Sequence, residues 1–396
     1  MAETPWRCAN CGLPYPAQGL PHRCPRCGGL FDRPTLPAWP ALPPRQPHDD
    51  MWRYRALLPV PPGAEPVTLG EGGTPLLPGP EPGVWFKAEY ANPTGSHKDR
   101  AASVVFTWLR ARGITTIVED SSGNAGAAWA AYAARSGITA HIFVPQAASG
   151  PKQDQIVAYG ARLHRVPGPR RAARQAAEEA AARGLGVYAS HAWLPMALDG
   201  YATIAYEIVE QLGQGPAAVV APVGHGALFV GLMRGFAVLQ QAGVIGALPQ
   251  GIAVQALACA PLWAMSHGGF EAWLLVSDEA ETAAEGVRVK DPVWGNEVAA
   301  WVHRSRGAVA AVDEDGIAAA RDFLARHGFY ITPTAALAWA AFGRLRETLP
   351  RPVVLVLTAA GYKTRPTAAA EPVPQTAPQP KAKGRGWWSI LRRKKE

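Results

Sequence analysis

Short apolar runs alternate with helix-like segments from residue 114 onward, and this alternation constrains the fold more than any other feature. Strand-like runs occupy 115–118, 140–144, 162–166, 187–189 and 217–221. Helix-like segments occupy 125–135, 152–159, 170–183 and 196–212, and the pattern continues through 252–257, 308–312, 316–327, 333–348 and 353–357. Strands and helices in alternation build βα units around parallel sheets. Because 396 residues exceed one typical domain, the sequence predicts two α/β domains.

Four of the five cysteines lie within the first 27 residues, as two Cys-x-x-Cys-Gly pairs. The pairs are Cys8 with Cys11 and Cys24 with Cys27. Two such knuckles complete a tetrahedral thiolate site with no open position, so the pattern predicts a structural zinc, with a redox or iron site as the alternative. A segment this short cannot fold on apolar burial alone, and metal binding would supply its stability. We therefore expect a zinc ribbon at residues 1–33 that acts as a docking or folding module.

The positive charge is concentrated near the C-terminal end. The formal net charge is +8, and residues 366–396 hold seven lysines and arginines against two glutamates, so they carry +5 of it. The rest is close to neutral, and we expect no nucleic-acid partner. The Thr, Ala, Pro, Gln and Lys composition after residue 365 predicts a disordered basic tail. At 387–395 two tryptophans precede a basic cluster, which is typical of a solvated tail or of a contact with an anionic membrane or a protein.

The segment before the core and the absence of long apolar runs in the sequence bear on the expected location of the protein. Residues 34–65 hold many prolines and predict an ordered wrap or a linker. No apolar run approaches the ~20 residues that span a bilayer. Residues 1–7 lack the apolar stretch of a signal peptide. The sequence therefore predicts a cytoplasmic protein.

One lysine stands at the junction of a turn and a helix. It belongs to the run Asn92-Pro93-Thr94-Gly95-Ser96-His97-Lys98-Asp99-Arg100, and the segment 100–110 has the pattern of a helix. The Lys98 amine should then face inward. Desolvation and nearby cations lower the pKa of such an amine, which leaves it nucleophilic near neutral pH and makes it a candidate to form a Schiff base.

Two small-residue loops lie between a strand and a helix. They read Ser121-Ser122-Gly123-Asn124-Ala125-Gly126 and Pro222-Val223-Gly224-His225-Gly226-Ala227. Unpaired amides at a helix start bind a carboxylate or a phosphate. Glycines let such amides close round an anion without obstruction by side chains. Each loop is therefore a candidate anion site, and an ordinary capped turn is the alternative.

Together these motifs resemble the fold-type II pyridoxal-phosphate enzymes, and most closely the threonine synthase family. The family's lysine motif reads Asn-Pro-Thr-Gly-Ser-Phe-Lys-Asp-Arg, so eight of nine positions match and His97 departs. A further match is Glu71-Gly72-Gly73-Thr74-Pro75-Leu76, which resembles the segment that precedes the family's lysine strand. The resemblance covers roughly 66–365. It implies a catalytic core with a smaller domain near 99–195 and a larger one near 66–98 and 196–365, and a homodimer.

The resemblance also implies roles for individual residues. Lys98 would hold pyridoxal 5'-phosphate covalently and shuttle the α proton. The residues implied to contact the cofactor are His97, Asn124, Gly224, His225, Gly226, Ala227 and Thr358. The residues implied to bind the substrate are Arg100, Ser122, Gly123 and Asn124. A hydroxyl such as that of Thr358 facing the pyridine nitrogen leaves it largely unprotonated, which favours elimination and replacement. Histidine directly before the lysine is typical of tryptophan synthase β chains, where it contacts the cofactor phosphate.

The implied substrate is a small amino acid, and phosphohomoserine, which threonine synthases convert to threonine, is the first choice. The family's pocket for that phosphate differs here at Ala125, His191, Ala192 and Ala197. Ala197 stands where the family has an arginine, and losing a bidentate arginine weakens phosphate binding. Three interpretations therefore stay open. They are a threonine-synthase-like enzyme, another activity of the fold such as a serine/threonine dehydratase or a sulfur-amino-acid synthase, and a non-catalytic scaffold.

Overall fold

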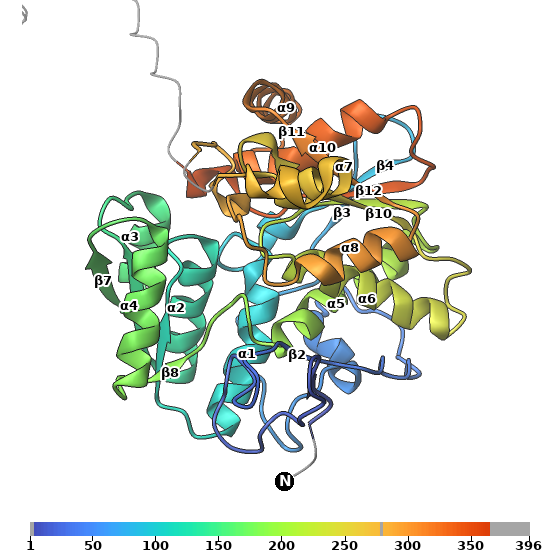
Figure 1. Ribbon diagram of the computed structural model, residues 1–396. Helices are drawn as coiled ribbons and strands as arrows, with labels where there is room; N and C mark the ends of the chain where they lie inside the picture. Colours follow the sequence, from blue (N-terminus) through green and yellow to red (C-terminus); the bar gives the residue numbers. More distant parts are fainter. Residues whose placement is uncertain (1–3, 278–279, 365–396) are drawn as a thin grey trace, which may run out of the picture. The chain divides into compact units, whose positions relative to one another are not determined.

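The computed structural model describes residues 4–277 and 280–364 (Figure 1). The expected basic tail at 366–396, with its segment 387–395, lies outside these residues. The described residues form one parallel sheet, one sheet that is parallel except at one edge, and a short two-stranded ribbon at the start of the chain. The predicted fold class, α/β with parallel sheets, is confirmed. The predicted division of the core into two domains at particular boundaries stays a prediction.

The smaller sheet has four parallel strands in the order β7-β6-β5-β8. Its strands are β5 (Thr116–Glu119), β6 (Thr139–Pro145), β7 (Arg162–Val166) and β8 (Val187–Tyr188). The helices that connect them are α2 (Asn124–Ser136), α3 (Pro151–Ala158) and α4 (Arg170–Ala182). Ile117 and Ile142 pack toward α2, whereas Val118 and Phe143 pack toward α4. Alternate residues of a strand point to opposite faces, so both faces of this sheet are covered.

The larger sheet has six strands in the order β11-β10-β9-β12-β4-β3. Its strands are β3 (Leu76–Pro78), β4 (Val84–Lys87), β9 (Ala218–Pro222), β10 (Gln250–Ala256), β11 (Ala308–Val312) and β12 (Val353–Val356). All neighbours are parallel except β3 and β4, which pair antiparallel at one edge. The last strand of the described residues, β12, therefore lies inside the sheet, between β9 and β4.

Helices cover both faces of the larger sheet. They are α1 (Lys98–Ala111), α5 (Met196–Leu212), α6 (Ala227–Gln241), α7 (Pro261–Leu274), α8 (Gly295–Arg304), α9 (Glu314–Arg326) and α10 (Pro333–Leu345). On β9, Val219 and Ala221 belong to the apolar cluster of α5, α6 and α8, while Ala218 and Val220 belong to that of α9 and α10. Strands buried on both faces must be apolar at nearly every position, which is why these runs stand out in the sequence. None of the helices in the described residues is long and apolar enough to cross a membrane.

The ribbon at the start of the chain packs on helices of the core. Its strands β1 (Arg7–Cys8) and β2 (Phe31–Asp32) pair antiparallel. Trp6 stacks edge-on against Trp108 of α1, with ring centroids 5.2 Å apart. Arg33 forms a salt bridge of 3.0 Å with Asp199 at the start of α5. The ribbon is thus fastened to two of the helices that carry candidate site residues.

Candidate active site

The lysine loop is held in place by its own aspartate and by a distant strand. Asp99 accepts hydrogen bonds from the Thr94 backbone amide at 2.6 Å and from the Thr94 hydroxyl at 2.5 Å, which closes the turn before Lys98. Beyond β12 the chain runs antiparallel to this loop, since Ser96 and Ala359 form a bridge. The His97 amide also donates to the Thr358 carbonyl at 3.0 Å. Lys98 and Thr358, which the sequence analysis assigned to one site, are therefore brought together.

The Lys98 side chain lies at the first position of α1 and is partly buried. Its Nζ atom lies 5.5 Å from the centre of the Tyr201 ring. Burial lowers the pKa of the Lys98 amine to about 8, although the Glu119 carboxylate acts in the opposite direction. A substantial fraction of the amine is therefore uncharged near neutral pH, as nucleophilic attack on an aldehyde requires.

His97 is neutral in this environment. Burial, then the charge of Lys98, hold the pKa of His97 well below its usual range. Its Nδ1 atom lies 3.2 Å from the Thr358 carbonyl, which can only accept, so Nδ1 carries the hydrogen. The His97 ring thereby donates to the backbone just after β12, and its Nε2 atom remains an acceptor.

The loop after β5 makes a tight turn into α2. A Cβ atom at Gly126 would lie 2.0 Å from the Ser121 carbonyl oxygen, so only glycine fits there. Asn124 is the first residue of α2, and its Oδ1 atom is buried without a hydrogen-bond partner. Ser122 and Gly123 precede it, and no side chain caps the helix start. The loop thus offers helix-start amides and one unsatisfied side-chain amide.

The second loop, between β9 and α6, has the same character. Gly226 has a φ of +96°, and a Cβ atom there would lie 2.8 Å from Val298 Cγ2. A Cβ atom at Gly224 would lie 2.8 Å from the Gly286 carbonyl oxygen. Ala227 begins α6, again without a side-chain cap. The His225 Nδ1 atom is buried without a partner, and burial, then His191, hold the pKa of His225 well below its usual range.

A buried carboxylate and histidine form a pair that the sequence analysis missed. Glu119 ends β5, and its Oε1 atom lies 2.5 Å from His191 Nδ1. Burial, then the neighbouring Asp120, raise the pKa of Glu119 well above its usual range. Burial, then Lys98, lower the pKa of His191 to about 3. The His191 ring lies 5.9 Å from that of His225, so the pair borders both loops and the lysine.

Arg100 points away from this site. It is fully buried, and its guanidinium bonds Glu89 at 2.7 Å and Glu207 at 2.7 Å. Lys87 also bonds Glu207, at 2.6 Å, so two cations and two carboxylates balance one another. Because all three guanidinium nitrogens of Arg100 donate within this network, it has no donor left for a substrate. This corrects the expected role of Arg100, whose place is structural.

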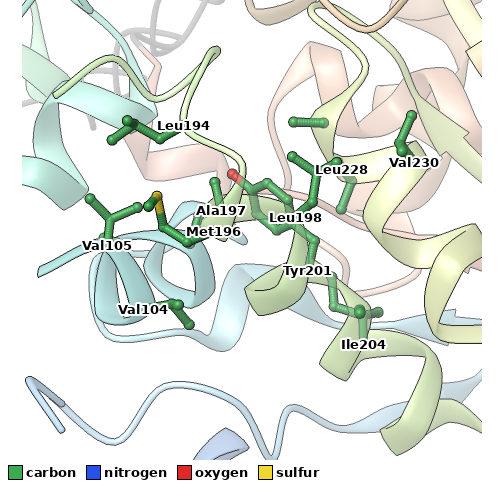
Figure 2. Close-up of a cluster of buried hydrophobic side chains, with 14 of the residues drawn as sticks. Val104, Val105, Leu194, Met196, Ala197, Leu198, Tyr201, Ile204, Leu228 and Val230 are labelled. Carbon is green, nitrogen blue, oxygen red and sulfur yellow. The ribbon is translucent and has the colours of Figure 1, made fainter. Parts of the chain in front are cut away.

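Tyr201 is a second residue that the sequence analysis did not single out. Figure 2 shows it within an apolar cluster formed by α1, α5 and α6, beside Leu198 and Leu228. Its hydroxyl is buried without a hydrogen-bond partner. Its ring centre lies 5.5 Å from that of His97. The apolar pattern of α5 does not indicate that Tyr201 lies beside Lys98 and His97, because a tyrosine at this spacing is usual in a core.

The four N-terminal cysteines converge. Their sulfur atoms all lie within 4.8 Å of one another, with Cys8 and Cys27 3.4 Å apart and Cys11 and Cys24 3.6 Å apart. Four thiolates around a zinc ion with bonds of ~2.3 Å lie at similar separations. The cluster is compatible with a zinc ribbon.

The Lys98 amine interacts with Glu119, just before the first glycine-bearing loop, and with His225 of the second. Both loops also hold unpartnered polar atoms, and this arrangement suits a cofactor that bears an aldehyde and a phosphate. The sequence pattern of the family described as pyridoxal-phosphate dependent enzyme matches residues 67–359. The chain belongs to this family.

Curated relatives and solved structures agree with this assignment. Threonine synthase from Methanocaldococcus jannaschii is 31% identical over 359 residues, which cover 86% of this chain and 87% of the relative. Threonine synthase from Mycobacterium leprae is 32% identical, with 83% and 91% covered. An L-serine ammonia-lyase from Rhizomucor miehei has a similar fold, with a TM-score of 0.62, 24% identity, and 75% and 95% covered. The protein is a pyridoxal-phosphate-dependent lyase of the threonine-synthase-like kind.

Proposed function

We propose that this protein catalyses elimination or replacement on a small amino acid, with pyridoxal phosphate bound at Lys98. The observation that carries the proposal is the Lys98 amine, whose pKa is lowered to about 8 in a site that also holds Thr358. The bound cofactor supplies an electron sink for the charge that develops at the substrate Cα when its proton leaves. With the cofactor bound, Lys98 would be the base that takes this proton.

The remaining residues fit the cofactor and the substrate as follows. The unsatisfied amide of Asn124 suits the ring hydroxyl, and the amides from Gly224 to Ala227 suit the phosphate. The unpartnered His225 Nδ1 atom is a further contact for an anion. Thr358 ends the strand run beside Lys98 and supplies a hydroxyl for the pyridine nitrogen. The Ser122 amide and the Asn124 side chain suit the substrate carboxylate, and the Gly123 amide, which donates to Ser121 Oγ at 3.2 Å, would exchange that bond for the carboxylate.

Two substrates follow from different observations. The relatives named threonine synthase favour phosphohomoserine, with threonine as the product. Ala197 stands where the family has an arginine, and Arg170, which acts on His191, is already paired with Asp120 at 3.2 Å. Glu119 and His191 lie there as a buried hydrogen-bonded pair. This second observation favours a hydroxyl-bearing amino acid such as serine or threonine.

The experiment that separates these readings is a substrate screen on the cofactor-loaded full chain. We expect an absorbance band near ~410 to 420 nm that changes when a substrate binds. Phosphate release from phosphohomoserine would support the first substrate, and ammonia release from serine or threonine the second. A chain with no such band and no product from any amino acid would contradict the proposed function.

We further propose that the cysteine cluster binds one structural zinc. Removal of zinc by a chelator should unfold the ribbon, because the ligand thiolates supply its stability. We expect about one zinc per chain, released by chelation with a fall in Tm and with new protease cleavage in the first ~33 residues. Cys24→Ser should lose the metal, whereas Cys259→Ser, outside the cluster, should retain it. Equal zinc content in the two variants would contradict the assignment.

A homodimer, a cytoplasmic location and the division of the core at residues 99–195 are further proposals. They rest on the resemblance and on sequence patterns, and sedimentation of the cofactor-loaded chain tests the first of them.

A further inference from the structure

A proton donor to the leaving group is the part of the proposed chemistry that Lys98 cannot supply alone. When an amino acid loses its α proton to Lys98 and expels a hydroxyl, the departing oxygen must gain a proton to leave as water. Chloride or phosphate can depart as anions, whereas hydroxide is a poor leaving group. A site that acts on a hydroxyl therefore needs a second acid near the lysine.

The Glu119–His191 pair has the geometry of such an acid. Glu119 is fully buried at the carboxyl end of β5, where ligands bind in parallel sheets. Its Oε2 atom also accepts from the His191 backbone amide at 3.2 Å, which together with the 2.5 Å side-chain contact fixes the carboxyl in place. The pair carries no net charge whether the shared proton sits on the carboxyl or on the imidazole, so it can hold a proton in a buried site.

Several titratable groups surround the Glu119–His191 pair. Those that interact with it among the described residues are His97 and Lys98 at the start of α1, Asp120 after β5, Arg170 on α4, Tyr188 on β8 and His225 before α6. Asp120 and Arg170 form their own salt bridge at 3.2 Å, and the Tyr188 hydroxyl donates to Asp120 at 3.0 Å. This leaves Lys98 as the cation that faces Glu119 without a carboxylate of its own.

We propose that Glu119, positioned by His191, gives its proton to the leaving group, and that the substrate is an amino acid that loses an unphosphorylated hydroxyl from its β carbon. The inference rests on the proposed function and names its substrate class. The Cβ–O bond breaks with its electron pair on oxygen, and the Glu119 proton converts that oxygen to water. The electron pair left at Cα forms the Cα–Cβ double bond.

The charges in the site stay balanced during this step. Lys98 becomes an ammonium as it takes the α proton, and Glu119 becomes a carboxylate as it gives its own. A buried site disfavours an unpaired charge, so creating the two charges together costs less than creating either alone. Transfer of the proton from Lys98 to Glu119 then restores both groups.

Glu119→Gln tests the proposal with two substrates that yield the same products. The amide keeps the shape of the carboxyl and lacks its proton. L-serine must lose a hydroxyl, whereas β-chloro-L-alanine loses chloride, and ammonia release measures both. We expect kcat/KM for serine to fall about 10²–10³-fold while that for β-chloroalanine stays within about threefold. The control is Glu179→Gln, the same change at an exposed carboxylate of α4 that pairs with Arg183, and it should not change the ratio of the two rates.

A second readout needs no turnover. The rate at which the cofactor-free chain takes up pyridoxal phosphate should rise with pH through about 8, because the neutral Lys98 amine reacts. Because Glu119 holds its proton before the reaction, replacing it with the neutral amide in Glu119→Gln should leave this profile in place. A displaced profile would show that Glu119 is a carboxylate in the resting site, and either that result or equal losses on both substrates would overturn the proposal and give Glu119 a structural role.

The wild-type chain separates failure of the inference from failure of the proposed function. Turnover of phosphohomoserine or β-chloroalanine with none of serine would overturn the inference and leave the proposed function intact. Absence of the cofactor band with every amino acid would overturn both.

Discussion

Lys98→Ala is expected to abolish the absorbance band near ~410 to 420 nm and to lower turnover by about 10³-fold or more. The band arises from the bond between the amine and the cofactor aldehyde, and the same amine is the proposed base. Borohydride should fix the cofactor to the wild-type chain and not to the variant. Spectra and the mass of a borohydride-treated peptide that contains residue 98 provide the measurement.

Lys363 supplies the matched control for this experiment. It is a second buried lysine, and burial lowers its pKa to about 8 despite the opposing charge of Asp99. Its amine, however, donates to the Gln155 side chain at 2.6 Å and to the Thr94 carbonyl. We expect Lys363→Met to retain the band. If the band survived Lys98→Ala and vanished in Lys363→Met, the cofactor would be bound to Lys363, and the proposal that it is bound to Lys98 would be wrong.

Arg100→Ala is expected to cost about 3–5 kcal/mol of the free energy of unfolding, because it leaves two buried carboxylates with one cation. Glu89 and Glu207 are both fully buried, and each bonds Arg100 at 2.7 Å. Urea denaturation of the cofactor-free chain measures the loss. If the alanine variant does not accumulate as folded protein, Arg100→Lys, which keeps the charge and reaches fewer partners, should give an intermediate loss.

Arg110→Ala, on the exposed side of the same helix, is the comparison for Arg100→Ala. Its guanidinium bonds the Glu65 carbonyl at the surface. We expect a change within about 0.5 kcal/mol, as is usual for an exposed side chain. Equal losses for the two arginines would contradict the importance of the buried network.

The parts of the fold that were predictable are those with a strong local pattern. The runs at 162–166, 308–312 and 196–212 match β7, β11 and α5. Strand β11 and helix α5 have apolar residues at most positions, whereas β7 has two arginines and a histidine and was predicted from its place in the alternation of strands and helices. Helix α7 was missed. Its Gly269 has a φ of +67°, and its apolar residues are spread around the helix, so no single face marked it.

The site was predictable where a motif is contiguous and not where it depends on distant pairing. Lys98 and the two glycine loops are local. The contact between Glu119 and His191 joins positions 72 apart in the sequence, and no motif in the residues next to either one predicts it. Two acids directly after a buried strand were the one available signal.

Arg100 was misassigned for a geometric reason. It lies two positions after Lys98 on α1, and two residues on a helix are separated by about 200° around the axis. Neighbours in the sequence therefore point to nearly opposite sides. Lys98 faces Tyr201, and Arg100 faces the carboxylates of Glu89 and Glu207.

The order of synthesis has a consequence for this protein, because its last strand enters the middle of the larger sheet. The smaller sheet uses residues 116–188 only and can form from a nascent chain as soon as they have emerged. The lysine loop, by contrast, lacks the backbone partners of Ser96 and His97 until Thr358 and Ala359 have been made. An incomplete chain thus carries Lys98 without the segment that holds His97, so we expect the proposed cofactor site to form only when translation of the core is nearly finished.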